Sequence, residues 1–357
     1  MIFIIKYLND WPKQLKSNRG LYFKMRRLAI IHIGMHKTGT TTIQSRLSAN
    51  RDSLLENGVL YPTSGAISTG GHLNLVYETI ASWNFKPNLG SWKDVVDETN
   101  KHNPPVIILS AENFSGARKT KEIIESVKLY CKEVNADPVI VGYLRPQHSY
   151  VNSLYAQNAA TGYTAKSFSD YLFENLSSDQ LCFEHVFGPW LDSFSTHKIL
   201  PYEREIDTPI VTQFLNQVGL EKIDLATSEE EKLNVRLGAR AVECARKATQ
   251  ILENVKSLPK AKRHLVAKSV ASKCTERFPD DLRFCGLDQN TALSIENFFS
   301  SSNKEFYTSR LGTEKLFATS VADTVYKKNM LSLDSASFWE MDRFLNIYSK
   351  AISQVIS

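Results

Sequence analysis

The stretch LAIIHIGMHKTGTTTIQ, residues 28–44, decides the fold class of this chain. Its first six residues, 28–33, are a short apolar run rich in β-branched side chains, which is typical of a strand buried in a parallel sheet. Gly34 ends the run, and a helix is predicted over 41–57, where apolar residues share one face and Asn57-Gly58 gives a stop signal. A strand, a glycine-containing turn and a helix in this order indicate a loop that binds phosphate.

The lysine of this loop does not stand where an ATP-binding loop has it. The signature G-x-x-x-x-G-K-[ST] requires lysine directly after the second glycine. Gly34 and Gly39 have the right separation, but Thr40 occupies the lysine position, and the only lysine is Lys37. Backbone N–H groups at a helix start still make an anion site, and threonine hydroxyls and a lysine charge add to it. We therefore expect a phosphate-bearing ligand other than Mg-ATP.

Alternating strands and helices continue along the chain. Further strands are predicted at 105–110, 138–143 and 197–202, with helical stretches between them. Such alternation indicates a parallel sheet with helices on both faces. The segment 62–104 is rich in Gly, Ser, Asn and Pro and reads as an insertion over the sheet edge, with a short helix near 73–83. The predicted fold class is α/β, a P-loop-type three-layer sandwich with a central parallel sheet.

The strand signal fades after about residue 225, and long charged helical stretches replace it. A mainly helical C-terminal part is therefore expected, ending in a helix at about 336–356. We divide the chain into an N-terminal arm (1–24), an α/β core (25–220) and a helical extension of the same domain (221–357).

Composition places the chain among ordinary globular proteins. Its 357 residues are 42% hydrophobic and 23% charged, and the net charge of +5 comes without a basic run that would indicate nucleic-acid binding. The five cysteines are scattered and never form a C-x-x-C pair, so we expect buried free thiols in a reducing compartment. The apolar residues before Lys6 are too few for a membrane span. We expect a soluble, cytoplasmic protein with no metal site.

A second phosphate grip is predicted in YLRPQHSYVNSLYAQ, residues 143–157. Arg145 stands at the end of the third predicted strand, and Pro146 suits the first turn of a helix. Ser153 follows eight residues after Arg145, about two turns along that helix. An arginine fork and a hydroxyl that converge on one anion are a typical phosphate contact. The alternative is an arginine with a structural role and a serine that faces solvent.

Together these motifs resemble the sulfotransferases that use 3′-phosphoadenosine 5′-phosphosulfate (PAPS). The resemblance rests on a loop G-x-x-K-[ST]-G-[ST]-[ST] that opens the fold and on a strand that ends in Arg with Ser eight residues later. The phrases HIGMHKTGTTTIQ, LSAENFS and YLRPQHSYVNSLYAQ are most similar to bacterial carbohydrate-type members, over roughly residues 28–215. FFSSSNKEFYTSRLG (298–312) is similar to the late segment that closes over the nucleotide in this family.

The resemblance implies transfer of a sulfuryl group from PAPS to an acceptor hydroxyl on a glycan or glycolipid, without a metal. Lys37 would stabilise the departing 5′-phosphate, and Arg145 and Ser153 would hold the 3′-phosphate. The 5′-phosphosulfate loop would comprise Gly34, His36, Lys37, Thr38, Gly39, Thr40 and Thr41.

The general base is the least determined part of the predicted site. Glu112 is the first candidate, because it stands just past the second long strand, at the edge where open α/β sheets place ligands. His72 is the second, since Gly70-Gly71 before it would let the backbone approach a ligand. His36 lies inside the phosphate loop and is expected to shape it.

Two other functions remain open from the sequence. A P-loop kinase with an aberrant loop would need an acidic metal ligand at the end of its second strand, which here reads Leu109-Ser110-Ala111. A non-catalytic nucleotide-binding protein would bind adenosine 3′,5′-bisphosphate and turn nothing over. The sequence names neither the acceptor nor the oligomeric state.

Overall fold

The described residues form two compact units in a computed structural model. It describes residues 26–116, 119–202, 208–226, 237–255, 257–330 and 338–356, so the expected arm at 1–24 lies outside the described residues. The first unit comprises Met1–Arg145, Phe183–Lys232 and Lys304–Leu316, and the second comprises Pro146–Cys182, Leu233–Asn303 and Phe317–Ser357. The segment 25–220, expected as one α/β core, is thus shared between the two units.

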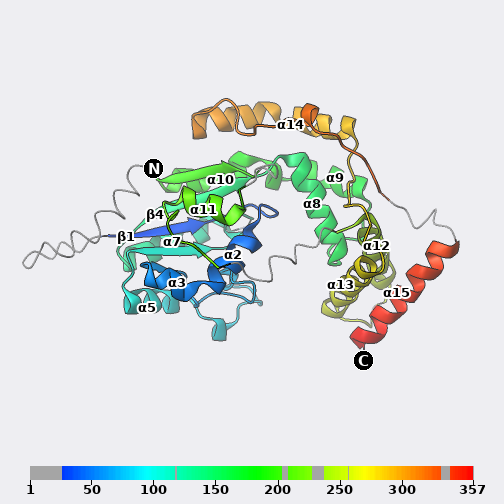
Figure 1. The fold of residues 1–357 in the computed structure, drawn as a ribbon, viewed down its shortest axis with the longest axis horizontal. Helices are drawn as coiled ribbons and strands as arrows, with labels where there is room; N and C mark the ends of the chain where they lie inside the picture. Colours follow the sequence, from blue (N-terminus) through cyan, green and yellow to red (C-terminus); the bar gives the residue numbers. More distant parts are fainter. Residues whose placement is uncertain are drawn as a thin grey trace, which may run out of the picture. The chain divides into compact units, whose positions relative to one another are not determined.

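The first unit is built on a five-stranded sheet in which all paired strands are parallel (Figure 1). The strand order is β2-β3-β1-β4-β5. The bounds are β1 Arg27–His32, β2 Val59–Leu60, β3 Val106–Ser110, β4 Ala136–Leu144 and β5 His197–Pro201. The α/β class and the four predicted strands are confirmed. The two-residue strand β2 was not predicted, because so short a strand carries no periodic signal.

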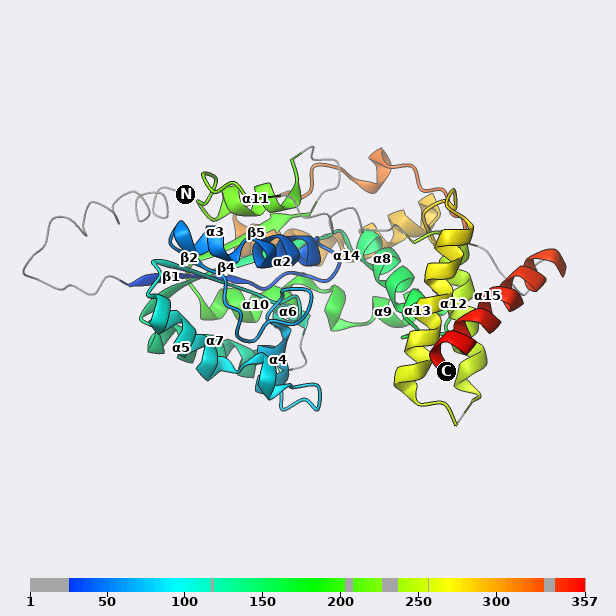
Figure 2. The same cartoon turned by 60° about the horizontal axis from the view of Figure 1, so that its bottom comes forward.

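Helices cover both faces of this sheet. Figure 2 shows α2, α3 and α11 on one side and α5, α7 and α10 on the other. The bounds in this unit are α2 Thr40–Ala49, α3 Arg51–Glu56, α4 Leu73–Thr79, α5 Trp92–His102, α6 Asn113–Gly116, α7 Thr120–Glu133, α10 Phe183–Ser193 and α11 Ile210–Gln217. Adjacent residues of β1, such as Ile30 and Ile31, are both fully buried. Because helices cover both faces of the strand, its side chains are buried on both sides, and residues 28–33 form a continuous apolar run.

The helix predicted over 41–57 is broken at Asn50. The side chain of Asn50 donates to the carbonyl oxygens of Arg46 (2.8 Å) and Ala226 (3.2 Å), and it accepts from the Ala226 N–H at 2.9 Å. Asparagine side chains compete with helical backbone bonds in this way. The break therefore comes from a contact with residue 226, which helical periodicity alone cannot reveal.

The insertion contains more helix than the sequence predicted. Helix α4 matches the short helical piece expected near 73–83, but α5 was missed inside the segment 62–104. Ser91 begins α5 with a capping box, in which its side chain accepts from the Asp94 N–H and Asp94 accepts from the Ser91 N–H. This helix start was not predicted because the surrounding segment is rich in glycine and proline.

The second unit is helical, as predicted for the C-terminal part. Its elements include α8 Gln147–Ala160, α9 Phe168–Leu176, α12 Ala239–Glu253, α13 Lys260–Arg277 and α15 Phe338–Ile356. Helix α14, Gln289–Phe306, belongs to this unit up to Asn303. Small apolar residues of α12 and α13 pack together, among them Cys244, Ala248, Val270 and Cys274. No helix among the described residues is both long and apolar enough to span a bilayer.

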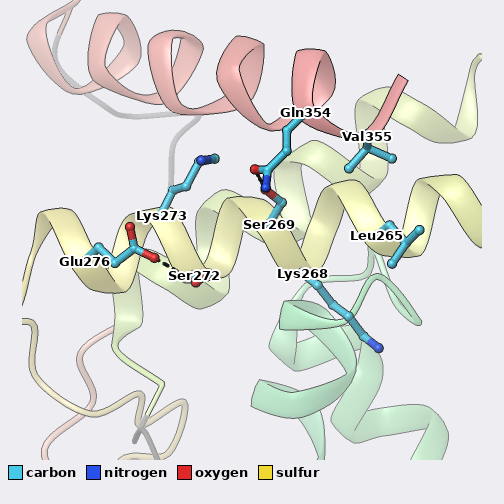
Figure 3. A pocket seen from close by; sticks show the side chains of 8 residues that line it. All are labelled: Leu265, Lys268, Ser269, Ser272, Lys273, Glu276, Gln354 and Val355. Carbon is cyan, nitrogen blue, oxygen red and sulfur yellow. Dashed lines mark hydrogen bonds between the residues drawn. The ribbon is translucent and has the colours of Figure 1, made fainter. Parts of the chain in front are cut away.

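An open groove of about 540 Å³ lies along α13 and α15 (Figure 3). Ser269 of α13 donates to Gln354 of α15 at 3.3 Å, and Ser272 donates to Glu276 at 3.0 Å. Lys268 and Lys273 also line the groove. Two pairs of its polar side chains are thus bonded to each other, and the groove contains none of the residues predicted for the site.

Replacing Gly142 by alanine tests the packing of the sheet against α10. A Cβ at residue 142 would lie 2.6 Å from Phe187 and 3.1 Å from Ile199. We expect Gly142→Ala to lower the free energy of unfolding by about 1–3 kcal/mol, measured by urea denaturation. The loss should shrink in a Phe187→Leu background, where the ring is gone. An equal loss in both backgrounds would contradict this packing.

Candidate functional site

The predicted phosphate loop leaves the carboxyl end of β1, the central strand. Its neighbours β3 and β4 pair with β1 in parallel, so their carboxyl ends reach the same edge of the sheet. β3 leads to Glu112 and β4 leads to Arg145. The chain passes from β1 to α2 on one face and from β3 to α7 on the other. Open α/β sheets bind ligands in the crevice at such a point.

The backbone of the loop suits an anion. Lys37 and Gly39 have φ angles of 65° and 79°, in the left-handed region, which is uncommon for a lysine. Gly39 is the N-cap of α2 and provides no side-chain acceptor for the first-turn N–H groups. A Cβ at Gly34 would lie 2.8 Å from the Thr40 hydroxyl, so only glycine fits there without a shift. N–H groups at the start of a helix and the helix dipole together attract a phosphate.

The loop threonines do not all face the same way. The Thr38 hydroxyl donates to the Met35 carbonyl oxygen at 2.6 Å and is fully buried. The Thr40 side chain is buried as well, whereas Thr41 is exposed. Thr38 therefore acts as a brace inside the loop, and Thr41 is the threonine that presents its side chain to solvent.

Two further hydrogen bonds fix the loop to the neighbouring strands. Arg145, which is buried, donates from Nη1 to the Lys37 carbonyl oxygen at 2.7 Å. Its guanidinium also lies over the Tyr202 ring, 5.6 Å from the centroid. From the other side, the Ser115 hydroxyl donates to the Gly34 carbonyl oxygen at 2.6 Å. Arg145 thus contacts the loop directly, a role that its position in the sequence did not indicate.

Ser153 lies in α8, within the second unit, and its side chain is buried. Helix α8 begins at Gln147, so Ser153 stands in its second turn, as the spacing from Arg145 predicted. That Ser153 binds the 3′-phosphate stays a prediction.

Glu112 contacts His36, which is itself a residue of the loop. Nδ1 of His36 lies 3.2 Å from Oε1 of Glu112, and about one third of each side chain is exposed. Burial by itself raises the pKa of Glu112, but the hydrogen bond to His36 and the charges of His36 and Lys37 outweigh it, so the net pKa is lowered. Glu112 is therefore an ionised carboxylate at neutral pH. Both residues were predicted for the site, but their contact with each other was not.

His72 is fully buried, and both of its ring nitrogens are bonded. Nδ1 accepts from the Ser110 N–H at 3.1 Å, which assigns the proton to Nε2, and Nε2 donates to the Pro62 carbonyl oxygen at 3.0 Å. Burial lowers the pKa of His72 to about 4. No ring nitrogen is left to take a proton from an acceptor. This arrangement favours a structural role, in which His72 ties the insertion to the end of β3, and it leaves Glu112 as the stronger candidate.

A buried polar network supports the end of β3. Nε2 of Gln44 donates to the carbonyl oxygen (3.3 Å) and hydroxyl (3.1 Å) of Ser110, whose hydroxyl lies 2.9 Å from Nδ1 of His32. Burial lowers the pKa of His32 to about 4. The sequence analysis missed these contacts. The signal for them was a glutamine among the buried positions of α2 and a histidine at the end of an apolar strand.

Arg310 anchors the late segment that resembles the family's closing segment. Its guanidinium forms ion pairs with Glu184 and with Asp192, the latter at 2.6 Å, and both acids belong to α10. These contacts attach residues 304–316 to the first unit. A role of this segment over a nucleotide stays a prediction.

No group of three or more His, Cys, Asp or Glu side chains in the described ranges is placed to hold a metal ion. No protein-family model, no curated protein and no solved structure matches this chain.

The two buried histidines predict a loss of stability in mild acid. Their pKa of about 4 lies below the ordinary value of 6.5, so folding favours the neutral ring. Their contribution to the free energy of unfolding is fully present above pH 6.5 and is lost as the pH falls toward 4. We expect about 2 kcal/mol of unfolding free energy per histidine to be lost between about pH 7 and pH 5, measured by urea denaturation.

His72→Gln, which keeps one acceptor and one donor, should remove about half of that loss. The exposed His102 is the matched control, since His102→Gln should leave the loss unchanged. The same acid sensitivity in His72→Gln and the unmutated protein would contradict the assignment.

Proposed function

We propose that this protein transfers a sulfuryl group from PAPS to an acceptor hydroxyl, with a saccharide as the acceptor class. In this proposal the fold is a P-loop-type three-layer sandwich, and residues 34–41 bind the 5′-phosphosulfate. The observation that carries it is the meeting of Lys37, the Glu112–His36 pair and Arg145 at the carboxyl edge of three neighbouring strands. The resemblance of the loop to G-x-x-K-[ST]-G-[ST]-[ST] adds to this support.

The loop supplies charge stabilisation rather than covalent chemistry. Sulfuryl transfer resembles phosphoryl transfer in needing positioning and stabilisation of negative charge. In this proposal the N–H groups of the α2 N-terminus and the Lys37 ammonium would stabilise the oxygen that gains charge as the sulfuryl group leaves. The left-handed backbone at Lys37, held by the bond from Arg145 to its carbonyl oxygen, sets the direction from which the side chain leaves the loop.

The contacting pair of His36, in the loop, and Glu112, after β3, would supply the base. Glu112 is ionised and partly exposed, and it belongs to the same sheet edge as the loop. An acceptor hydroxyl placed between the pair and the loop can lose its proton to the pair while its oxygen attacks sulfur. This arrangement requires no metal ion. We also propose a cytoplasmic location, which the five cysteine thiols support.

Calorimetric and thermal-shift titrations with adenosine 3′,5′-bisphosphate and with Mg-ATP test this proposal. A ligand that binds only the folded state stabilises it by about 3 kcal/mol at a hundred times its Kd. We expect the bisphosphate to raise the melting temperature and Mg-ATP to leave it unchanged. Lys37→Ala and Arg145→Ala should each weaken bisphosphate binding by at least about 10-fold, as loss of a charge-assisted hydrogen bond does.

Lys132 provides the matched control. It is exposed in the last turn of α7, away from the carboxyl edge of the sheet, so Lys132→Ala should bind the bisphosphate like the unmutated protein. Stabilisation by Mg-ATP alone would contradict the proposal and support a kinase. Bisphosphate binding without sulfuryl transfer to any saccharide in an acceptor screen would support a non-catalytic nucleotide-binding protein.

A further inference from the structure

The contact between His36 and Glu112 determines which nitrogen of the imidazole ring carries a proton. The atom of His36 that faces Oε1 of Glu112 is Nδ1, at 3.2 Å. An ionised carboxylate only accepts hydrogen bonds, so Nδ1 must carry a proton to bond to it. In the neutral ring Nε2 is then unprotonated and holds the lone pair that can accept a proton.

Nε2 of His36 points toward Gly116 of α6. A Cβ added at Gly116 would lie 3.3 Å from Nε2, closer than an ordinary van der Waals contact. Gly116 is itself exposed, so Nε2 lies near the surface and not in the core. Within the described residues no hydrogen bond engages this nitrogen, in contrast to His72, whose two ring nitrogens both have partners.

The Glu112 carboxylate and the His36 imidazole are not equally suited to act as the general base. The pKa of Glu112 is lowered, which makes its carboxylate a weaker proton acceptor than an ordinary glutamate. Imidazole is the side chain whose protonation changes near neutral pH, and a carboxylate on Nδ1 stabilises the imidazolium that forms when Nε2 gains a proton. The contact between the two therefore suits His36 as the acceptor of the proton and Glu112 as its support.

We propose that Nε2 of His36 is the general base of the reaction and that Glu112 is a positioning residue acting through Nδ1. This inference rests on the proposed sulfuryl transfer. The acceptor oxygen forms its bond to sulfur as its proton passes to Nε2. The bond between sulfur and the bridging oxygen of the 5′-phosphate breaks, and its electron pair stays on that oxygen, beside Lys37. His36 leaves the step as an imidazolium paired with the Glu112 carboxylate.

The tautomer of His36 can be measured without any ligand. Two-bond ¹H–¹⁵N correlation spectra distinguish a ring protonated on Nδ1 from one protonated on Nε2, and the His36 signal is identified by its absence in His36→Ala. At mildly alkaline pH we expect the Nδ1-protonated form in the unmutated protein. In Glu112→Ala we expect the Nε2-protonated form that predominates in free imidazole side chains. An Nε2-protonated ring in the unmutated protein would overturn the proposal.

Transfer kinetics provide the second test. General-base catalysis contributes about 10²–10⁴-fold, so His36→Ala should lower kcat by about that factor. The bisphosphate should bind to His36→Ala within about 3-fold of its normal affinity, because His36 shapes the loop while Lys37 and Arg145 supply the charges that hold the phosphates. Added imidazole should restore part of the lost rate in His36→Ala and none in Lys37→Ala.

The outcomes separate this proposal from the proposed function. Normal turnover in His36→Ala together with a large loss in Glu112→Gln would make Glu112 the base and overturn the inference, while sulfuryl transfer itself stands. A lower kcat in His36→Ala that imidazole does not restore, together with weakened bisphosphate binding, would mean that His36 only holds the loop in shape. That result would also overturn the inference. His102→Ala removes an exposed histidine outside the site and serves as control, with an unchanged rate expected.

Discussion

The candidate site depends on two hydrogen bonds to the carbonyl oxygens of the loop after β1. Arg145 holds the Lys37 carbonyl from the end of β4, and Ser115 holds that of Gly34 from α6. A hydrogen bond from a charged donor contributes about 2 kcal/mol, which offsets the cost of holding a lysine in the left-handed region. These bonds attach the loop after β1 to the end of β4 and to α6, and the loop carries Lys37 and His36.

Polar contacts beneath the loop give this edge of the sheet its rigidity. Ser110 is bonded through its backbone and hydroxyl to Gln44, His32 and His72, all of which are buried. Buried polar groups that are bonded to each other specify one arrangement, because any displacement leaves a donor or acceptor unsatisfied. Glu112 follows directly after this network, and its carboxylate is thereby held beside the loop. The contact between His36 and Glu112 is thereby held at the partly exposed edge of the sheet, next to these buried polar contacts.

The sequence predicted what local patterns encode and missed what distant contacts decide. Apolar runs gave four of the five strands, and the loop with Lys37 and Gly39 was found from its glycines and threonines. The helix break at Asn50 depends on residue 226, and no local pattern contains that contact. His72 was named for its glycine-rich surroundings, yet it is buried because its ring bridges Pro62 and Ser110. The bond between His36 and Glu112 joins residues 76 positions apart in sequence and needed the sheet to bring them together.

A crystal structure of the protein with adenosine 3′,5′-bisphosphate would show whether the loop after β1 binds the nucleotide. We expect the 5′-phosphate at the N-terminus of α2, bonded to the N–H groups of Gly39, Thr40 and Thr41, with the Lys37 ammonium beside it. We also expect the His36–Glu112 pair on the side of that phosphate where the sulfate would stand. A nucleotide bound at another place, or a loop that closes without contact to phosphate, would rule out this site.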